Sequence, residues 1–300
     1  MQNKILVAAC LCVSFVSAWA DDSGEVSLGD FLLIKSPAFA PSTRLEYSAA
    51  SEVDFDSAAG GFSYNQLSLG SPLAKPYRIN PCNMVVFSAR YDATWLDTDT
   101  FLDDMKLHDF RLNVRWMYRQ PDSKWAWTMA LSPGISTDGE GIGSDDFSIN
   151  GTAGFRYARS SSFAWIGGVV FFHNALETRV FPGIGFQWRP ADDLLVRWMG
   201  PNLRAAWQPT EDWILHAGVR IAGGTWNVEQ NGTSYNVDLQ TFQASVGVER
   251  QIADQIWLGL WGGLTFGNEL EIETSSGARV FKDDADMGWF VQLGIRRSIW

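Results

Sequence analysis

Charged side chains inside apolar segments are the first candidates for chemistry in this sequence. An arginine that alternates with apolar residues shares one face of a strand with any nearby carboxylate, and opposite charges on that face would pair. We expect these faces to line the interior of a barrel, where they could favour or repel ions. The charged residues with this pattern are Arg90, Asp92, Asp109, Arg111, Arg115, Arg156, Arg197, Arg204, Arg220 and Glu249.

Histidines are the second candidates, as general bases. The chain has three, His108, His173 and His216. A lipid hydrolase would combine a histidine base with a nucleophilic serine and an orienting group. None of the three stands in an H-x-S arrangement. We therefore assign no catalytic residue and no cofactor and expect a protein that is not an enzyme, with an outer-membrane lipid-modifying enzyme as the alternative.

Acidic clusters between the apolar segments are the third candidates. Clustered carboxylate oxygens suit divalent cations. No cluster has the full spacing of a calcium-binding loop with its distal glutamate. We expect solvated loops and assign no metal ligand, with divalent cations at these loops as an alternative partner. The residues are Asp97, Asp99, Asp103, Asp104, Asp138, Glu140, Asp145, Asp146, Asp283, Asp284 and Asp286.

A period of two residues governs the segments that carry the charges. From Met84 onward apolar and polar residues alternate over whole segments, as where Leu112 and Val114 flank Asn113. This period is typical of β-strands with one apolar face, and runs of about ten residues match a strand that spans a bilayer. Two weaker strands, 43–50 and 62–70, precede Met84. The pattern predicts an all-β fold over 42–300, an antiparallel up-and-down transmembrane β-barrel of about 14 strands, with 12 as the second choice.

Connections between these strands alternate in length. Short turns fall at 120–124, 159–162, 190–193, 208–212 and 251–254, and most of the intervening connections are longer. Gly200-Pro201 is an exception, because it is very short for its side. Aromatic residues flank the short turns, as expected for an interfacial girdle, although aromatic residues favour strands in general. They are Tyr118, Trp125, Tyr157, Phe163, Trp188, Trp207, Trp213 and Trp257.

The segment from Phe181 to Leu215 shows the repeating unit most clearly. Its turns are Pro/Asp-rich and lie between aromatic or apolar residues. The pattern PGIGFQWRPADD followed by MGPNLRAAWQPTEDW resembles an uncharacterised domain-of-unknown-function family of bacterial outer-membrane β-barrels. The resemblance covers this segment alone. It implies the fold and the outer-membrane location, and it carries no activity.

The two ends of the chain carry export and assembly signals. Lys4, the apolar run 5–16 and Ala18-Trp19-Ala20 predict a cleavable signal peptide over 1–20, with cleavage after Ala20. Residues 21–41 are expected to form a leader or an interior plug. By resemblance, the terminal Trp300 would be read by the barrel assembly machinery, although it is one residue out of step with the apolar face through Trp289 and Leu293.

The composition limits the classes of partner that the protein could bind. The net charge of −11 argues against nucleic acid, so outer-membrane lipid is the main expected partner. After cleavage Cys82 is the sole cysteine, which leaves no internal disulfide.

The expected size of the barrel limits the functions that the protein could have. A barrel of about 14 strands is wider than one that side chains just fill and narrower than an open porin. We expect a passive role, either narrow-pore diffusion of small solutes or structural and surface interaction. A soluble secreted β-sandwich remains an alternative, because it has the same strand period.

Overall fold

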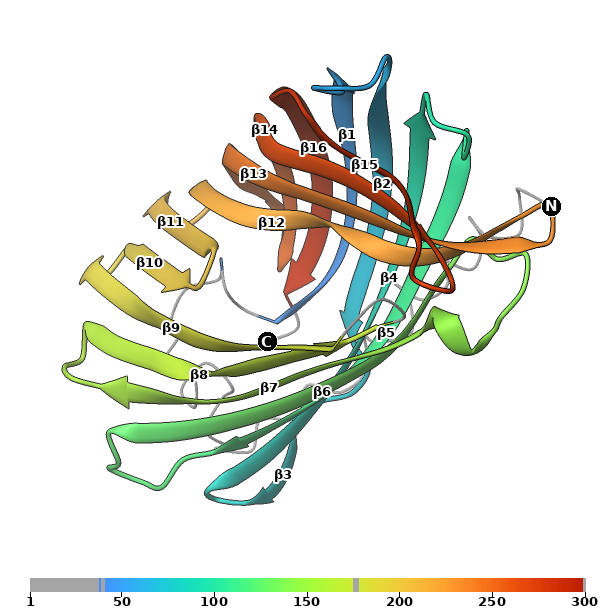
Figure 1. Ribbon diagram of the computed structural model, residues 1–300. Coiled ribbons are helices and arrows are strands. Elements are labelled where there is room, and N and C mark those ends of the chain that lie inside the picture. The colour runs from blue at the N-terminus through green and yellow to red at the C-terminus, as the bar shows by residue number, and fades with distance from the viewer. Residues whose placement is uncertain (1–37, 39–40, 175–177, 299–300) are drawn as a thin grey trace.

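The computed structural model describes residues 38, 41–174 and 178–298, and they form a closed antiparallel β-barrel (Figure 1). Fourteen strands make the ring, which closes where β1 pairs with β16 from Ser42 opposite Ser298 to Ala50 opposite Phe290. The expected fold class and the count of 14 are confirmed. The ring strands are β1 (Ser42–Asp54), β2 (Gly61–Pro72), β4 (Asn83–Thr98), β5 (Met105–Tyr118), β6 (Trp125–Thr137), β7 (Phe147–Ala158), β8 (Phe163–His173), β9 (Thr178–Ala191), β10 (Leu194–Met199), β11 (Asn202–Thr210), β12 (Trp213–Gln230), β13 (Thr233–Ala253), β14 (Ile256–Thr274) and β16 (Gly288–Ser298).

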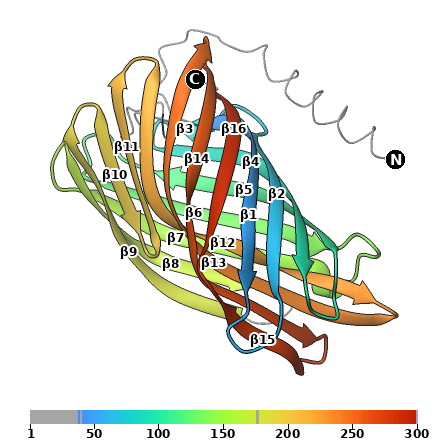
Figure 2. The same ribbon diagram turned by 90° about the horizontal axis from the view of Figure 1, so that it is seen from above.

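Two further strands lie outside the ring, and neither is expected from the sequence. The short β3 (Tyr77–Asn80) pairs only with β4. The strand β15 (Arg279–Ala285) extends the far end of β14 and bridges to Phe55, next to the turn between β1 and β2 (Figure 2). The sequence predicts a loop at 274–286, because the charged residues there hide the strand period. A 3-10 turn, η2 (Ser144–Asp146), precedes β7.

The barrel has a short-turn end and a long-loop end. The short-turn end carries the connections β5–β6, β7–β8, β9–β10, β11–β12 and β13–β14, and Ser42 and Ser298 lie there. At the long-loop end the β12–β13 connection is shorter than the loop that the sequence predicts over 228–234. Asn231 and Gly232 have φ of 53° and 76°, the positive values of a tight hairpin turn, so both strands run through most of the expected loop.

Apolar side chains cover the outside of the barrel wall. Exposed residues alternate along the ring strands, as with Leu112 and Val114 on β5 and Leu258 and Leu260 on β14. A contiguous exposed apolar surface of this size suits hydrocarbon and not water. The alternation thus places lipid outside and the charged faces inside.

The far halves of β12, β13 and β14 bend across the long-loop end. All three bend at one level, at Gly223 (φ +98°), at the irregularity after Gln240 and at Gly267 (φ +55°). Beyond the bend, β12 bridges to β6 through Asn227 and Thr137. Figure 1 shows β12 and β13 sweeping over β4 to β6. We call residues 224–239 and 268–285 the roof.

A hydrophobic core fixes the roof to the opposite wall. Val237, Leu270 and Ile272 are fully buried, and they pack against residues of β1, β2, β4 and β5 such as Leu107, which is fully buried as well. The interior is therefore apolar at this end, which the alternation of polar and apolar residues does not predict. The roof residues in the core are Trp226, Val228, Val237, Leu239, Leu270 and Ile272, and the wall residues are Val53, Phe55, Phe62, Tyr64, Leu96, Leu102, Met105 and Leu107.

Candidate functional site

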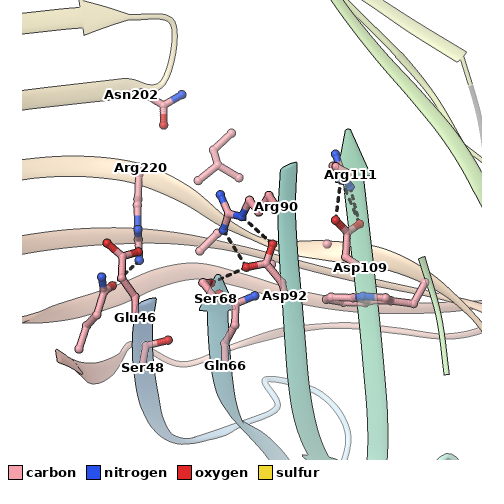
Figure 3. A pocket seen from close by; sticks show the side chains of 16 residues that line it. Glu46, Ser48, Gln66, Ser68, Arg90, Asp92, Asp109, Arg111, Asn202 and Arg220 are labelled. Atoms are coloured by element: carbon pink, nitrogen blue, oxygen red, sulfur yellow. Dashed lines mark hydrogen bonds and ion pairs between the residues drawn. The ribbon is translucent and has the colours of Figure 1, made fainter. Parts of the chain in front are cut away.

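Charged side chains of β4, β5 and β12 line a cavity of about 400 Å³ below the roof (Figure 3). We call it the roof cavity. It contains five of the residues singled out from the sequence, together with Glu46, Asn202 and Gln292 from other strands. Those five are Arg90, Asp92, Asp109, Arg111 and Arg220.

Two arginine–aspartate pairs neutralise one wall of the roof cavity. Arg90 Nε donates to Asp92 Oδ2 at 2.6 Å, and Arg111 Nε donates to Asp109 Oδ1 at 2.8 Å. Across the ladder Arg90 faces Arg111, and Asp92 faces Asp109. Each pair therefore forms along its own strand while like charges face each other between strands. The hydroxyl of Ser68 donates to Asp92 and that of Ser136 donates to Asp109, so both carboxylates are fully engaged.

Arg220 enters the roof cavity from the opposite wall. Its guanidinium donates to Gln243 Oε1 and to Gln292 Oε1, both at 2.8 Å. These partners are neutral amides, and Glu46 adds a carboxylate to the lining of the same cavity. Figure 3 shows Arg220 and Glu46 together on this side. The roof cavity is consequently polar and balanced in charge.

A second cavity of about 220 Å³ lies nearer the short-turn end and includes Arg204 and His216 in its lining. Beside it, the buried Glu249 accepts two hydrogen bonds from Arg296 and lies 3.1 Å from His216 Nε2. The sequence reasoning missed Arg296 as an interior residue. Its place on the same face as Gln292 could have identified it.

The segment before β1 also reaches the interior. Ala38 is buried against Ala206, Ile214 and Trp257, and its carbonyl accepts a hydrogen bond from Arg204 at 3.2 Å. Residue 38 and Pro41 are the only described residues of the 21–41 segment, and the signal peptide and Trp300 lie outside the described residues.

Trp257 corrects the predicted girdle. It is 3% exposed and stacks on the guanidinium of Arg296, 5.0 Å from the carbon to the ring centroid. Outward positions on β14 belong to Leu258 and Leu260, so strand alternation turns Trp257 inward. The other seven predicted residues, Tyr118, Trp125, Tyr157, Phe163, Trp188, Trp207 and Trp213, lie on the outward face at the short-turn end.

A third cavity, of about 250 Å³, collects arginines without carboxylates. We call it the arginine cavity, and Arg115, Arg156 and Arg197 line it from β5, β7 and β10. No lining residue is Asp or Glu, and Gln187 adds a neutral amide. Arg156 Nε is buried and has no hydrogen-bond partner among the described residues. Arg119 and Arg189 lie close enough to add to the positive potential at Arg156.

Several carboxylates of the predicted acidic loops accept hydrogen bonds from backbone amides. Asp283 accepts a hydrogen bond from the amide of Ala58 at 2.6 Å, and Asp138 accepts one from the amide of Glu229 at 2.8 Å. Asp97, Asp103 and Asp104 bring carboxylate oxygens within 4.8 Å of one another on the exposed surface. Exposed carboxylates of this kind are common in solvated loops, and we assign no metal to them.

The three histidines lie apart. His108 Nδ1 is 2.8 Å from the Tyr91 hydroxyl, His173 Nδ1 is 2.8 Å from the Thr178 hydroxyl, and His216 is the one beside Glu249. In the part of the chain that the structure describes, none of these contacts involves a serine hydroxyl.

Solved structures with a similar fold are distant in sequence. An outer membrane channel from Pseudomonas putida F1 shares 12% identity over 92% of this chain and 100% of its own, with a TM-score of 0.48. A FadL homologue from Pseudomonas aeruginosa shares 10% over 86% of this chain and 90% of its own, with a TM-score of 0.48. Outer membrane phospholipase A from Escherichia coli shares 13% sequence identity over 87% of this chain and 94% of its own, with a TM-score of 0.38.

Family membership rests on the sequence. The chain matches no curated protein. None of the helices among the described residues is long and apolar enough to cross a membrane. The model of a domain of unknown function, DUF6268, matches residues 96–298, which is more than half of the chain. This protein therefore belongs to the DUF6268 family.

Proposed function

We propose that the protein is a passive outer-membrane channel of narrow bore that favours small anionic solutes. The arginine cavity carries the proposal, because Arg115, Arg156 and Arg197 line it and no carboxylate does. Fixed positive charge in a confined passage of low dielectric concentrates anions, and bulk salt screens it less than surface charge.

The rest of the interior does not offset this potential. In the roof cavity Asp92 and Asp109 are already paired with their own arginines. Glu249 is paired with Arg296. The acidic clusters lie in the connections at the long-loop end, which faces outward in a barrel that keeps its short turns in the periplasm. Exposed charges at that distance are screened within a Debye length of about 10 Å at 0.1 M salt.

Reversal potentials in planar bilayers test the proposal. In a salt gradient the wild-type protein should prefer anions. The triple variant Arg115→Gln, Arg156→Gln and Arg197→Gln should lose that preference, because the amide keeps most of the side-chain volume without the charge. Arg279→Gln is the matched control for removing an arginine, since Arg279 lies outside the ring on β15. Cation preference, or anion preference unchanged in the triple variant, would refute the proposed function.

A further inference from the structure

The arginine cavity is a pocket in one wall of the barrel. Every residue that lines it belongs to one of the neighbouring strands from β5 to β10 (Figure 1). Gly154 of β7 and Gly168 of β8 lie opposite each other in the ladder and contribute no side chain to the lining. A Cβ at either position would collide with a carbonyl oxygen, that of Gly167 or that of Ala153. The packing of the two strands therefore keeps this part of the cavity free of side chains.

The three arginines that line this cavity lie close to one another. The charge of Arg197 on β10 interacts with that of Arg115 on β5 and with that of Arg156 on β7. No carboxylate lines the cavity, so nothing in the lining offsets the repulsion between these like charges. The Nε of Arg156 is buried without a hydrogen-bond partner among the described residues, and a charged donor in that state is costly. Both features indicate an anion that binds among the three guanidinium groups.

The number of guanidinium groups limits the charge and the shape of that anion. A single carboxylate accepts two parallel hydrogen bonds from one guanidinium, which would leave two of the arginines without a partner. A phosphate monoester has three terminal oxygens and a charge of about −1.5 to −2 at pH 7, so it can accept hydrogen bonds from all three. The three arginines therefore favour a phosphate group over a carboxylate.

The rest of the lining suits the organic part of a ligand. Met117, Ile166 and Met199 line the cavity beside the arginines, and their side chains are apolar. The cavity volume of about 250 Å³ lies just below the range of roughly 300–1,000 Å³ that is usual for pockets of drug-sized molecules. A small apolar group joined to a phosphate would contact both kinds of side chain, whereas a free phosphate would contact only the arginines.

We infer that the arginine cavity is a binding site for small organic phosphates, in which the three arginines hold the phosphate group and the apolar side chains contact the organic part. This inference rests on the proposed function and names its substrate class. A specific site differs from a general attraction of anions in one respect. Binding at the site depends on the arginines that line it, whereas a general potential depends on every interior charge.

Isothermal titration calorimetry of the refolded protein in detergent micelles tests the inference, with phenyl phosphate as the probe. We expect one phenyl phosphate to bind per chain. Each of the single variants Arg115→Gln, Arg156→Gln and Arg197→Gln should bind it at least about tenfold more weakly, because each loses a hydrogen bond between charged groups. Testing the three variants separately gives a result even where one of them does not fold.

Arg220→Gln is the matched control for these variants. It removes an interior arginine that lines the roof cavity and not the arginine cavity, so its affinity for phenyl phosphate should equal that of the wild type. Two further ligands test the chemistry of the site. Benzoate has the ring with a single carboxylate, and inorganic phosphate has the phosphate without the ring, so both should bind more weakly than phenyl phosphate.

Three results would overturn the inference. The first is that phenyl phosphate does not bind to the wild-type protein. The second is that Arg220→Gln weakens binding as much as the variants of the arginine cavity do, and the third is that benzoate or inorganic phosphate binds as tightly as phenyl phosphate. The proposed function fails separately, through the absence of anion preference in the reversal potentials, which do not depend on any organic phosphate.

Discussion

Arg296 donates two hydrogen bonds to Glu249 inside the barrel, from Nε to Oε1 at 2.9 Å and from Nη2 to Oε2 at 2.8 Å. The two side chains are 7% and 3% exposed. A pair so enclosed depends on both partners, because either charge alone would stay buried without compensation.

Arg296→Met should therefore lower the free energy of unfolding by about 3–5 kcal/mol, the usual cost of breaking a buried ion pair. The double variant Arg296→Met and Glu249→Leu should recover much of this loss, since no charge remains unpaired. Urea titrations of refolded protein in lipid vesicles measure the free energy of unfolding of each variant. A double variant less stable than the single one would show that the pair does not act as a unit.

Substitutions on neighbouring residues of β5 test the orientation of the wall. Leu112→Arg or Val114→Arg puts a charge on the outward face, where both side chains are 40% exposed to lipid. The expected cost is about 2–4 kcal/mol, as for arginine near the bilayer midplane. Asn113→Arg, whose side chain lies inside and donates to Ser132, should cost far less. Equal penalties in the same refolding titration would contradict the assigned faces.

Gly223→Ala should loosen the roof. An alanine Cβ would lie 1.9 Å from the Leu239 carbonyl oxygen, and φ of +98° already disfavours any L side chain. We expect a loss of more than about 1 kcal/mol, because alanine at positive φ is destabilising even without a clash. Gly232→Ala is the control. Its φ is +76°, and no atom lies within 4 Å of the added Cβ, so this variant measures the cost of the backbone conformation without a clash. Hydrogen exchange of the amides in 224–239 should accelerate more in the first variant than in the second.

The pairing of β15 with the far end of β14, within the roof, should become less stable in acid. Partial burial raises the pKa of Glu271, but hydrogen bonds from Lys282 and Arg279 outweigh it and hold the net pKa below its ordinary value. The folded pKa is thus depressed, so the stabilisation is complete above the unfolded pKa of about 4.3 and is lost as pH falls through the folded value. Hydrogen exchange in 279–285, corrected for its intrinsic pH dependence, should show this loss.

Glu271→Gln is the control for that pH dependence. Removing the titrating group should flatten the acid response of 279–285 while leaving exchange in the ring strands unchanged. An acid response identical to that of the wild type would assign the effect to other carboxylates, such as Glu269, which also pairs with Lys282.

The sequence by itself determined the barrel wall. Alternation on β5 and β14 identified the outward and inward faces, since a period of two is a property of the strand alone. The same local information indicated the count of 14 and the inward position of every charged residue chosen from the pattern. The connection 228–234 was expected among the longer loops, although its Asn231-Gly232 pair is typical of a tight hairpin turn.

The tertiary structure decided what those faces do. Which arginines are neutralised depends on strand register, which pairs Arg90 with Asp92 and gathers Arg115, Arg156 and Arg197 where no carboxylate lies. The roof arises from a bend at Gly223, and the bend is stabilised by contacts with β1, β2, β4 and β5 that are remote in sequence. A local period carries no information on such long-range packing, and so the hydrophobic core between the roof and the wall became visible only in three dimensions.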